Sequence, residues 1–128
     1  MENKDLIEQI IQGTQTEEQV TINYDGAGYT FTLKPLTTGQ LSKLKRIEQS
    51  GLKVQMDKKG QTEVAPINAG EMAEAQEEAK YTGISFSVDA PVDKVKQLPQ
   101  SVIDDLFKEI IRISELSEKD LIVVRNFQ

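Results

Sequence analysis

Carboxylates are the main side chains in this sequence that could do chemistry. Asp104, Asp105 and Glu109 lie close together in a segment with helical periodicity, and paired carboxylates can act as general acid and base. The chain has no histidine and no cysteine, which excludes serine–histidine catalysis, cysteine nucleophiles and ordinary zinc sites. Because the three acids flank a strongly apolar helical stripe, where acids normally face water, we expect a protein that is not an enzyme.

Two further groups resemble ligand sites. The segment 69–82 carries acids spaced as one helical face: Glu71, Glu74, Glu77 and Glu78. A carboxylate metal site needs ligands that converge from several elements, and the sequence places none, so we expect no metal and no other cofactor. Gly26 and Gly28 are followed by a strand pattern, whereas a phosphate-binding loop ends in Gly-Lys-Ser/Thr and opens a helix. We assign these glycines to a turn.

The formal net charge of −6 argues against a nucleic-acid partner, because nucleic-acid affinity depends on clustered Lys and Arg. One small basic group, Lys43, Lys45 and Arg46, is interpreted as a solvated helical face. No apolar run is long enough to cross a bilayer, and the acidic start is not that of a signal peptide. We expect a cytoplasmic protein with no membrane partner.

Residues 19–34 predict a β-hairpin. Apolar residues alternate with polar ones on both sides of an Asp-Gly-Ala-Gly sequence; they are Val20, Ile22, Tyr24, Tyr29, Phe31 and Leu33. Pairing Tyr24 with Tyr29 places all six on one face, so we expect that face to be buried. In this register Ile22 lies opposite Phe31, and Val20 lies opposite Leu33.

A strand-to-helix corner follows. Pro35 cannot donate to a β-ladder and therefore ends the strand. Thr37 and Gln40 have the spacing of a capping box, which predicts a helix that begins at Thr37 and stops near Gly51. The apolar face of this helix consists of Leu41, Leu44 and Ile47.

The middle of the chain is less regular. Residues 52–67 alternate weakly around a charged turn, and two alternatives stay open: a second, exposed hairpin or a loop. Asn68 and Glu71 repeat the cap spacing and predict a helix over 69–82, with Met72, Ala75, Ala79 and Tyr81 toward the interior. Residues 83–91, Gly-Ile-Ser-Phe-Ser-Val-Asp-Ala-Pro, are interpreted as a short extended link.

The strongest helical pattern covers residues 99–114, with Pro99 suited to the first turn. Its apolar stripe is Val102, Ile103, Leu106, Phe107, Ile110, Ile111 and Ile113. This stripe is wider than a small core normally needs, so we expect part of it to be exposed, with Leu106 and Phe107 the best candidates. Ser117 and Asp120 predict the start of a last helix.

Residues 3–12 predict a short amphipathic helix with Leu6, Ile7, Ile10 and Ile11 on its apolar face. Such a short terminal helix needs something to dock on. Docking on the core is favoured over a partner-binding arm.

Together these elements predict one α+β domain, residues 1–128, with an antiparallel β-hairpin, and possibly a second, packed against three to five α-helices. Its parts are an N-terminal helix and link over 1–18, a hairpin plus helix over 19–51, an exposed hairpin or loop over 52–67, and a helical part over 68–128.

Two stretches carry a resemblance to a known family. The first is the strand that ends in Phe-Thr-Leu-Lys-Pro-Leu-Thr, Phe31 to Thr37, together with the helix after it. The second is the stretch 88–117, in which Leu-Pro is followed by an acidic-apolar helix. Both resemble the tail assembly chaperones of long-tailed bacteriophages and prophages. The matched stretches, about 19–48 and 88–117, cover under half of the chain.

The resemblance implies a non-enzymatic protein of the host cytoplasm that is absent from the mature virion. Such chaperones coat the tape measure protein and help to recruit tail tube subunits, and many have a longer form made by ribosomal frameshifting. Binding a long helical client requires exposed apolar stripes on a soluble, charged protein.

We therefore expect a protein that self-associates and binds its client through apolar helical faces; the candidate residues are Leu41, Leu44, Ile47, Val102, Leu106, Phe107 and Ile110. The alternative is another small phage or prophage structural adaptor, such as a tail completion or head–tail connector protein, which would be found in purified particles.

Overall fold

The computed structural model describes the chain except for residues 1, 15, 51, 57–61, 67–68 and 128. Its elements, in chain order, are α1 (Asn3–Thr14), β1 (Glu18–Tyr24), β2 (Ala27–Leu33), α2 (Thr38–Gln49), β3 (Leu52–Met56), β4 (Thr62–Pro66), α3 (Ala69–Val88), α4 (Val92–Val95), α5 (Gln100–Ser114) and the 3₁₀ helix η1 (Ile122–Phe127). The fold is α+β, with an antiparallel hairpin packed against helices, which confirms the predicted fold class.

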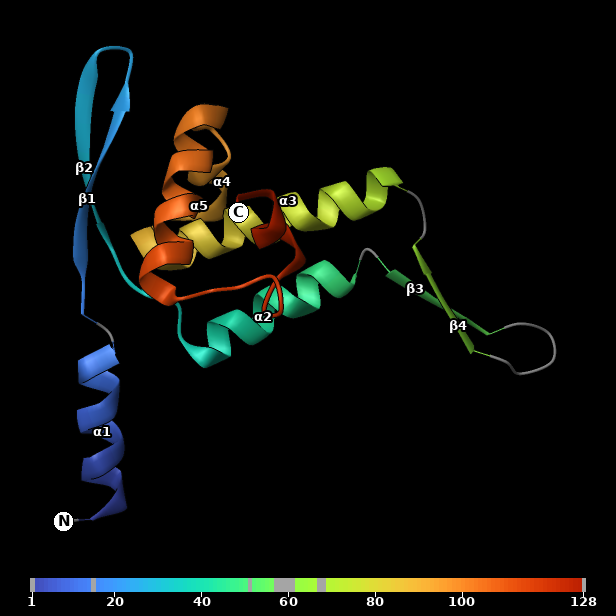
Figure 1. Cartoon of the computed structure of the whole chain (residues 1–128), viewed down its shortest axis with the longest axis horizontal. Helices are drawn as coiled ribbons and strands as arrows, with labels where there is room; N and C mark the ends of the chain where they lie inside the picture. The colour runs from blue at the N-terminus through green and yellow to red at the C-terminus, as the bar shows by residue number, and fades with distance from the viewer. Residues whose placement is uncertain (1, 15, 51, 57–61, 67–68, 128) are drawn as a thin grey trace.

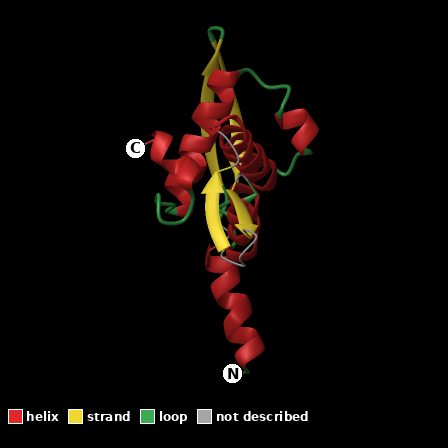
Figure 2. Ribbon diagram, turned by 90° about the vertical axis from the view of Figure 1, so that its right-hand side faces the viewer, coloured by secondary structure: helices red, strands yellow, loops and turns green. Residues whose placement is uncertain are grey.

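The helices α2, α3 and α5 form the body of the molecule, and β1–β2 packs along one side of it (Figure 1). The helix α1 projects away from the body beyond the base of this hairpin, as the turned view also shows (Figure 2). The hairpin β3–β4 extends from the C-terminal end of α2 and the N-terminal end of α3. Within the described residues, no helix is both long and apolar enough to span a bilayer.

The first hairpin forms, but its register differs from the prediction. Val20 pairs with Phe31, Ile22 with Tyr29, and Tyr24 with Ala27. The turn contains only Asp25 and Gly26, at φ 51° and 78°, which is the two-residue type I′ geometry that Asp-Gly favours. The predicted pairing of Tyr24 with Tyr29 is therefore wrong by two residues.

A two-residue shift keeps every side chain on its predicted face. Ile22 and Leu33 are accordingly buried, at 4% and 0% exposure. The tip differs from the expected buried face, because Tyr24 and Tyr29 remain 42% and 53% exposed. The hairpin extends beyond the helices there, so less of the body covers its last residues (Figure 1).

The corner after β2 agrees with the prediction. Thr37 caps α2 through a complete capping box: its side chain accepts the Gln40 N–H at 3.1 Å, and the Gln40 side chain accepts the Thr37 N–H at 3.0 Å. The helix ends at Gln49 with Ser50 as its C-cap. The expected stop at Gly51 lies outside the described residues.

For the segment 52–67, the structure contains the hairpin alternative. β3 pairs with β4 in antiparallel register, with Val54 opposite Val64. The expected cap at Asn68 lies outside the described residues.

The helix α3 continues to Val88, so the predicted extended link over 83–91 is wrong for its first six residues. Locally this stretch favours a strand, but tertiary contacts decide otherwise. A Cβ at Gly83 would lie 3.1 Å from Leu44 Cδ1, so glycine here allows a close approach of α3 to α2. Ser87 also fixes the helix end, since its Oγ donates to the Lys34 carbonyl at 2.8 Å and its own carbonyl accepts the Lys34 N–H at 3.0 Å.

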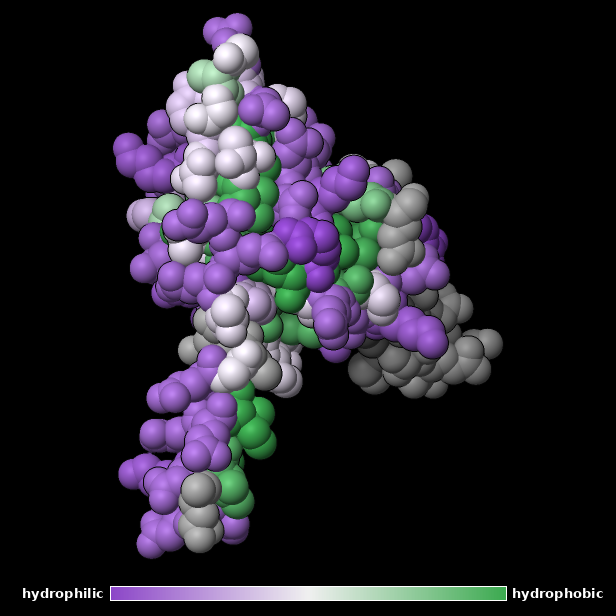
Figure 3. Space-filling model, turned by 60° about the vertical axis from the view of Figure 1, so that its left-hand side comes forward, coloured by the Kyte–Doolittle hydropathy of each residue, from purple (hydrophilic) through white to green (hydrophobic). Residues whose placement is uncertain are grey.

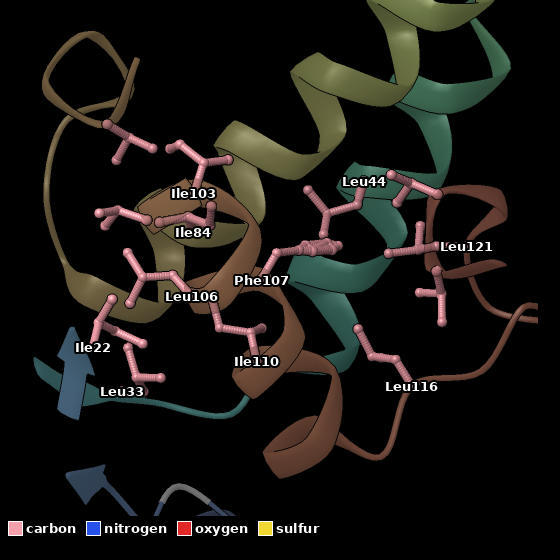
Figure 4. Close-up of a cluster of buried hydrophobic side chains, with 14 residues drawn as sticks. Ile22, Leu33, Leu44, Ile84, Ile103, Leu106, Phe107, Ile110, Leu116 and Leu121 are labelled. Atoms are coloured by element: carbon pink, nitrogen blue, oxygen red, sulfur yellow. The ribbon is translucent and has the colours of Figure 1, made fainter. Parts of the chain in front are cut away.

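One hydrophobic core joins the hairpin, the three long helices and the C-terminal segment (Figure 4). Its buried members are Ile22, Leu33, Leu44, Ile84, Val95, Val102, Ile103, Leu106, Phe107, Ile110, Leu116, Leu121, Val123 and Val124. The stripe of α5 lies at its centre, between side chains from the hairpin and from α2.

The C-terminal segment folds differently from the predicted α-helix. Asp120 does bind Ser117, accepting its N–H at 3.0 Å, but a turn follows and then the 3₁₀ helix η1. Glu48 holds this segment on α2, because its carboxylate accepts the N–H groups of Ile122 at 2.8 Å and Val123 at 2.7 Å. A carboxylate bound to the backbone N–H groups at the start of a helical turn satisfies donors that would otherwise be orphaned.

Candidate protein-binding surface

The helix α1 presents an apolar stripe to solvent. Its residues Leu6, Ile7, Ile10 and Ile11 are 44%, 56%, 66% and 43% exposed. Figure 3 shows this stripe as a continuous apolar face along one side of α1, with polar residues along the other. The favoured prediction that this helix docks on the core is therefore wrong, and the arrangement is that of the alternative, a projecting arm.

A groove lies where α1 meets the body. It has a volume of about 720 Å³ and is lined by residues from three places in the chain: Ile10 and Ile11 of α1, Pro35 to Gly39 of the corner, and Ile113 to Glu115 of α5. The α1 stripe and this groove are continuous through Ile10 and Ile11, and together we call them the arm surface.

Two segments that line the groove are joined by a hydrogen bond. The N–H of Leu36 donates to Ser114 Oγ at 3.0 Å, which joins the corner to the last turn of α5. That turn ends at Glu115, which adopts the left-handed conformation at φ 55°, as is common just beyond a helix C-terminus. The N–H of Leu116 then donates to the Ile111 carbonyl at 3.0 Å and closes the turn.

Ion pairs lie at Glu17 and Glu18, where β1 begins. Arg112 on α5 binds Glu18 at the start of β1 and also Glu109, the latter at 2.7 Å. The hydrogen bond that Arg112 donates to Glu18, followed by the one that it donates to Glu109, raises the pKa of its guanidinium. Lys34 lies 3.9 Å from Glu17 in the link that precedes β1. These charges lie on the surface and contribute little stability each.

Most of the predicted partner-binding residues are not on a surface. Leu44, Val102, Leu106, Phe107 and Ile110 are between 0% and 6% exposed and belong to the core. Leu41 and Ile47 are partly buried against that core. The expectation that Leu106 or Phe107 would be exposed is wrong. Phe127 from the C-terminal segment stacks on Phe107, whereas Leu106 lies beside Ile22, Leu33 and Ile84 (Figure 4).

The candidate catalytic acids do not converge on one site. Asp104 accepts hydrogen bonds from Lys80 at 3.3 Å and from Gln100 at 2.9 Å. Glu109 is occupied by Arg112, and Asp105 is exposed. In the part of the chain that the structure describes, no group of three or more acidic side chains is placed to hold a metal ion.

The basic group on α2 stays on the surface, as interpreted. Lys43, Lys45 and Arg46 are all exposed. The Lys43 ammonium lies 5.9 Å from the centroid of the Phe86 ring, which is a cation–π distance.

The sequence contained the signal for the arm surface, namely the periodicity of Leu6, Ile7, Ile10 and Ile11, but it could not show that this helix points away from the body. No sequence pattern around Ile113 or the corner indicated that these residues line a groove. Comparison of the chain with protein-family models, with curated proteins and with solved structures finds no match.

Proposed function

We propose that this protein is a non-enzymatic tail assembly chaperone of a long-tailed bacteriophage or prophage, and that it binds the tape measure protein through the arm surface. It would act in the host cytoplasm, help to recruit tail tube subunits and be absent from the mature virion. The observation that carries the proposal is the exposed α1 stripe beside an open groove, since amphipathic helices bind each other through such faces.

The resemblance noted in the sequence supports the same function. Its two stretches, 19–48 and 88–117, are far apart in the chain, but the bond from Leu36 to Ser114 joins them. The corner and the end of α5 thereby both line the groove. The residues that carry the resemblance thus lie beside the proposed binding surface.

The energetics fit a chaperone that binds and releases. About half of each stripe side chain remains accessible, so covering all four would contribute roughly 4 kcal/mol before the cost of association. Such weak sites suit a long client that many copies coat together, because neighbouring copies can add affinity through self-association. The net charge of −6 helps to keep such a protein soluble.

The test is co-expression with a tape measure protein, reading the soluble client and its co-purification with this chain. The variant Ile7→Asp/Ile10→Asp places two charges on the stripe, and we expect it to lose client binding. The matched control, Gln9→Asp/Gln12→Asp, adds the same charges at the same spacing on the polar side of α1, where both residues are exposed, and should bind normally.

Equal binding by both variants would overturn the assignment of the arm surface. Mass spectrometry of purified virions provides a second criterion. A stoichiometric amount of this chain in finished particles would replace the chaperone with a structural adaptor, such as a tail completion or head–tail connector protein.

A further inference from the structure

The outer edge of β2 is open along most of its length. Residues 27–30 and Thr32 are all exposed. Among the described residues, no backbone hydrogen bond joins Ala27–Leu33 to any element other than β1. Only beyond the strand does the edge acquire a partner, where the Lys34 N–H donates to the Ser87 carbonyl at 3.0 Å.

The turn geometry determines which backbone groups face outward. In a two-residue hairpin, the residues that flank the turn, here Tyr24 and Ala27, form a hydrogen-bonded pair, and such pairs alternate along the ladder. Gly28, Thr30 and Thr32 therefore direct their N–H and C=O groups away from β1. Lys34 continues the same alternation, and its N–H does bind outside the hairpin.

This edge lacks the features by which proteins prevent strand pairing. The strand Ala-Gly-Tyr-Thr-Phe-Thr-Leu contains no charged residue and no proline, and its pairing with β1 runs without a bulge. Edge strands are usually protected by such features or by a covering element. A two-stranded hairpin is also marginally stable and gains from a third strand.

We propose that the β2 edge binds the β2 edge of a second copy of this chain, antiparallel about Thr30, so that two hairpins form one four-stranded sheet. In this register Thr30 lies opposite Thr30 of the second copy, and Gly28 lies opposite Thr32. All outward backbone groups of these residues are then satisfied. Tyr29 of each copy lies opposite Phe31 of the other, and such aromatic cross-strand pairs stabilise a sheet.

Charge distinguishes this pairing from the equivalent pairing of two β1 edges. About Thr30 the pairing ends at Gly28 and Thr32, because Ser87 of the same chain occupies the edge at Lys34, and no like charges lie opposite each other. About Thr21, the centre of the outward positions on β1, Glu17 would lie opposite Asp25 of the second copy. Like charges directly opposite destabilise a sheet, so the β2 edge is favoured.

Disulfide trapping tests the proposal on the full chain, which has no cysteine of its own. Opposed residues of a hydrogen-bonded pair have Cα atoms about 5.5 Å apart, within the range of a disulfide. We expect Thr30→Cys to form a cross-linked dimer on mild oxidation. Thr21→Cys is the matched control, because Thr21 is its cross-strand neighbour, exposed on the same face, and it should not cross-link.

Proline variants test the backbone contacts. Thr30→Pro removes an outward N–H of β2, whereas Thr21→Pro removes an outward N–H of β1, and both lose the same bond between the two threonine hydroxyls. By light scattering we expect Thr30→Pro to lose the dimer and Thr21→Pro to keep it, with circular dichroism showing that both are folded.

The proposal is overturned if the wild-type protein is monomeric at high concentration, if Thr30→Cys does not cross-link, or if both cysteine variants cross-link equally. It does not depend on the chaperone function, because every measurement is made without a client and with the arm surface unchanged.

Discussion

Phe127 stacks on Phe107, with ring centroids 5.3 Å apart and ring planes inclined by 20°. Phe107 is 1% exposed, so the end of the chain covers the middle of the α5 stripe. The hairpin and α3 cover the rest of that stripe. The apolar surface that we propose for a partner lies instead on α1, whose stripe is exposed.

We expect Phe127→Ala to lower the free energy of unfolding by about 2–3 kcal/mol, because it removes a large, partly buried side chain from a stacked aromatic pair. Urea denaturation measures this change. Asn126→Ala is the control, since Asn126 is exposed and its loss should cost less than about 0.5 kcal/mol. Equal effects would mean that the stacking does not stabilise the fold.

The carboxylate of Glu48 should be important for the position of η1. Glu48→Gln retains the shape, but the N–H groups of Ile122 and Val123 bind different oxygens of Glu48, and in glutamine one of those positions is an NH₂ group that cannot accept. A buried donor is then left without an acceptor, so we expect a loss of about 2–3 kcal/mol in unfolding free energy. The neighbouring exposed Gln49→Ala should be nearly neutral. A stable Glu48→Gln protein would show that the C-terminal segment does not need this anchor.

The capping box offers a comparison between adjacent residues. Thr37→Ala removes the acceptor for the Gln40 N–H, and we expect it to cost about 1 kcal/mol. Thr38→Ala changes the first helical residue, which is exposed, and should have little effect. Chemical denaturation measures the free energy of unfolding of both variants. Equal losses of this free energy would contradict a specific role for the cap.

Removal of residues 1–14 should leave the free energy of unfolding within about 1 kcal/mol of the full chain, because the α1 stripe is outside the core. Leu106→Ala, which creates a cavity at a fully buried position, should cost about 3 kcal/mol in the same assay. If the truncated chain instead lost more than about 2 kcal/mol, α1 would dock on the body in solution.

Several features of the fold are local and could be predicted from the sequence. Thr37 and Gln40 are three residues apart, so their capping box needs nothing from the rest of the chain. The alternation around Asp25-Gly26 likewise encodes a hairpin and the face that it buries. The register was mispredicted because both pairings bury the same face, and only the φ > 0 preference of Asp-Gly separates them.

The sequence by itself therefore determined the elements whose signals lie within a few residues: the hairpin, the corner, and the amphipathic helices α1 and α5. Tertiary structure decided which apolar faces are covered. The strand-like residues 83–88 became helical because Gly83 packs against Leu44 and Ser87 binds Lys34. The α5 stripe became core because α3 and the hairpin pack against it and Phe127 of the C-terminal segment stacks on Phe107. The stripe of α1 stayed exposed because α1 lies beside the body and its side chains are not part of the hydrophobic core. Periodicity identifies an apolar face, but whether that face is buried depends on contacts between residues far apart in the chain, and those contacts have no local signal.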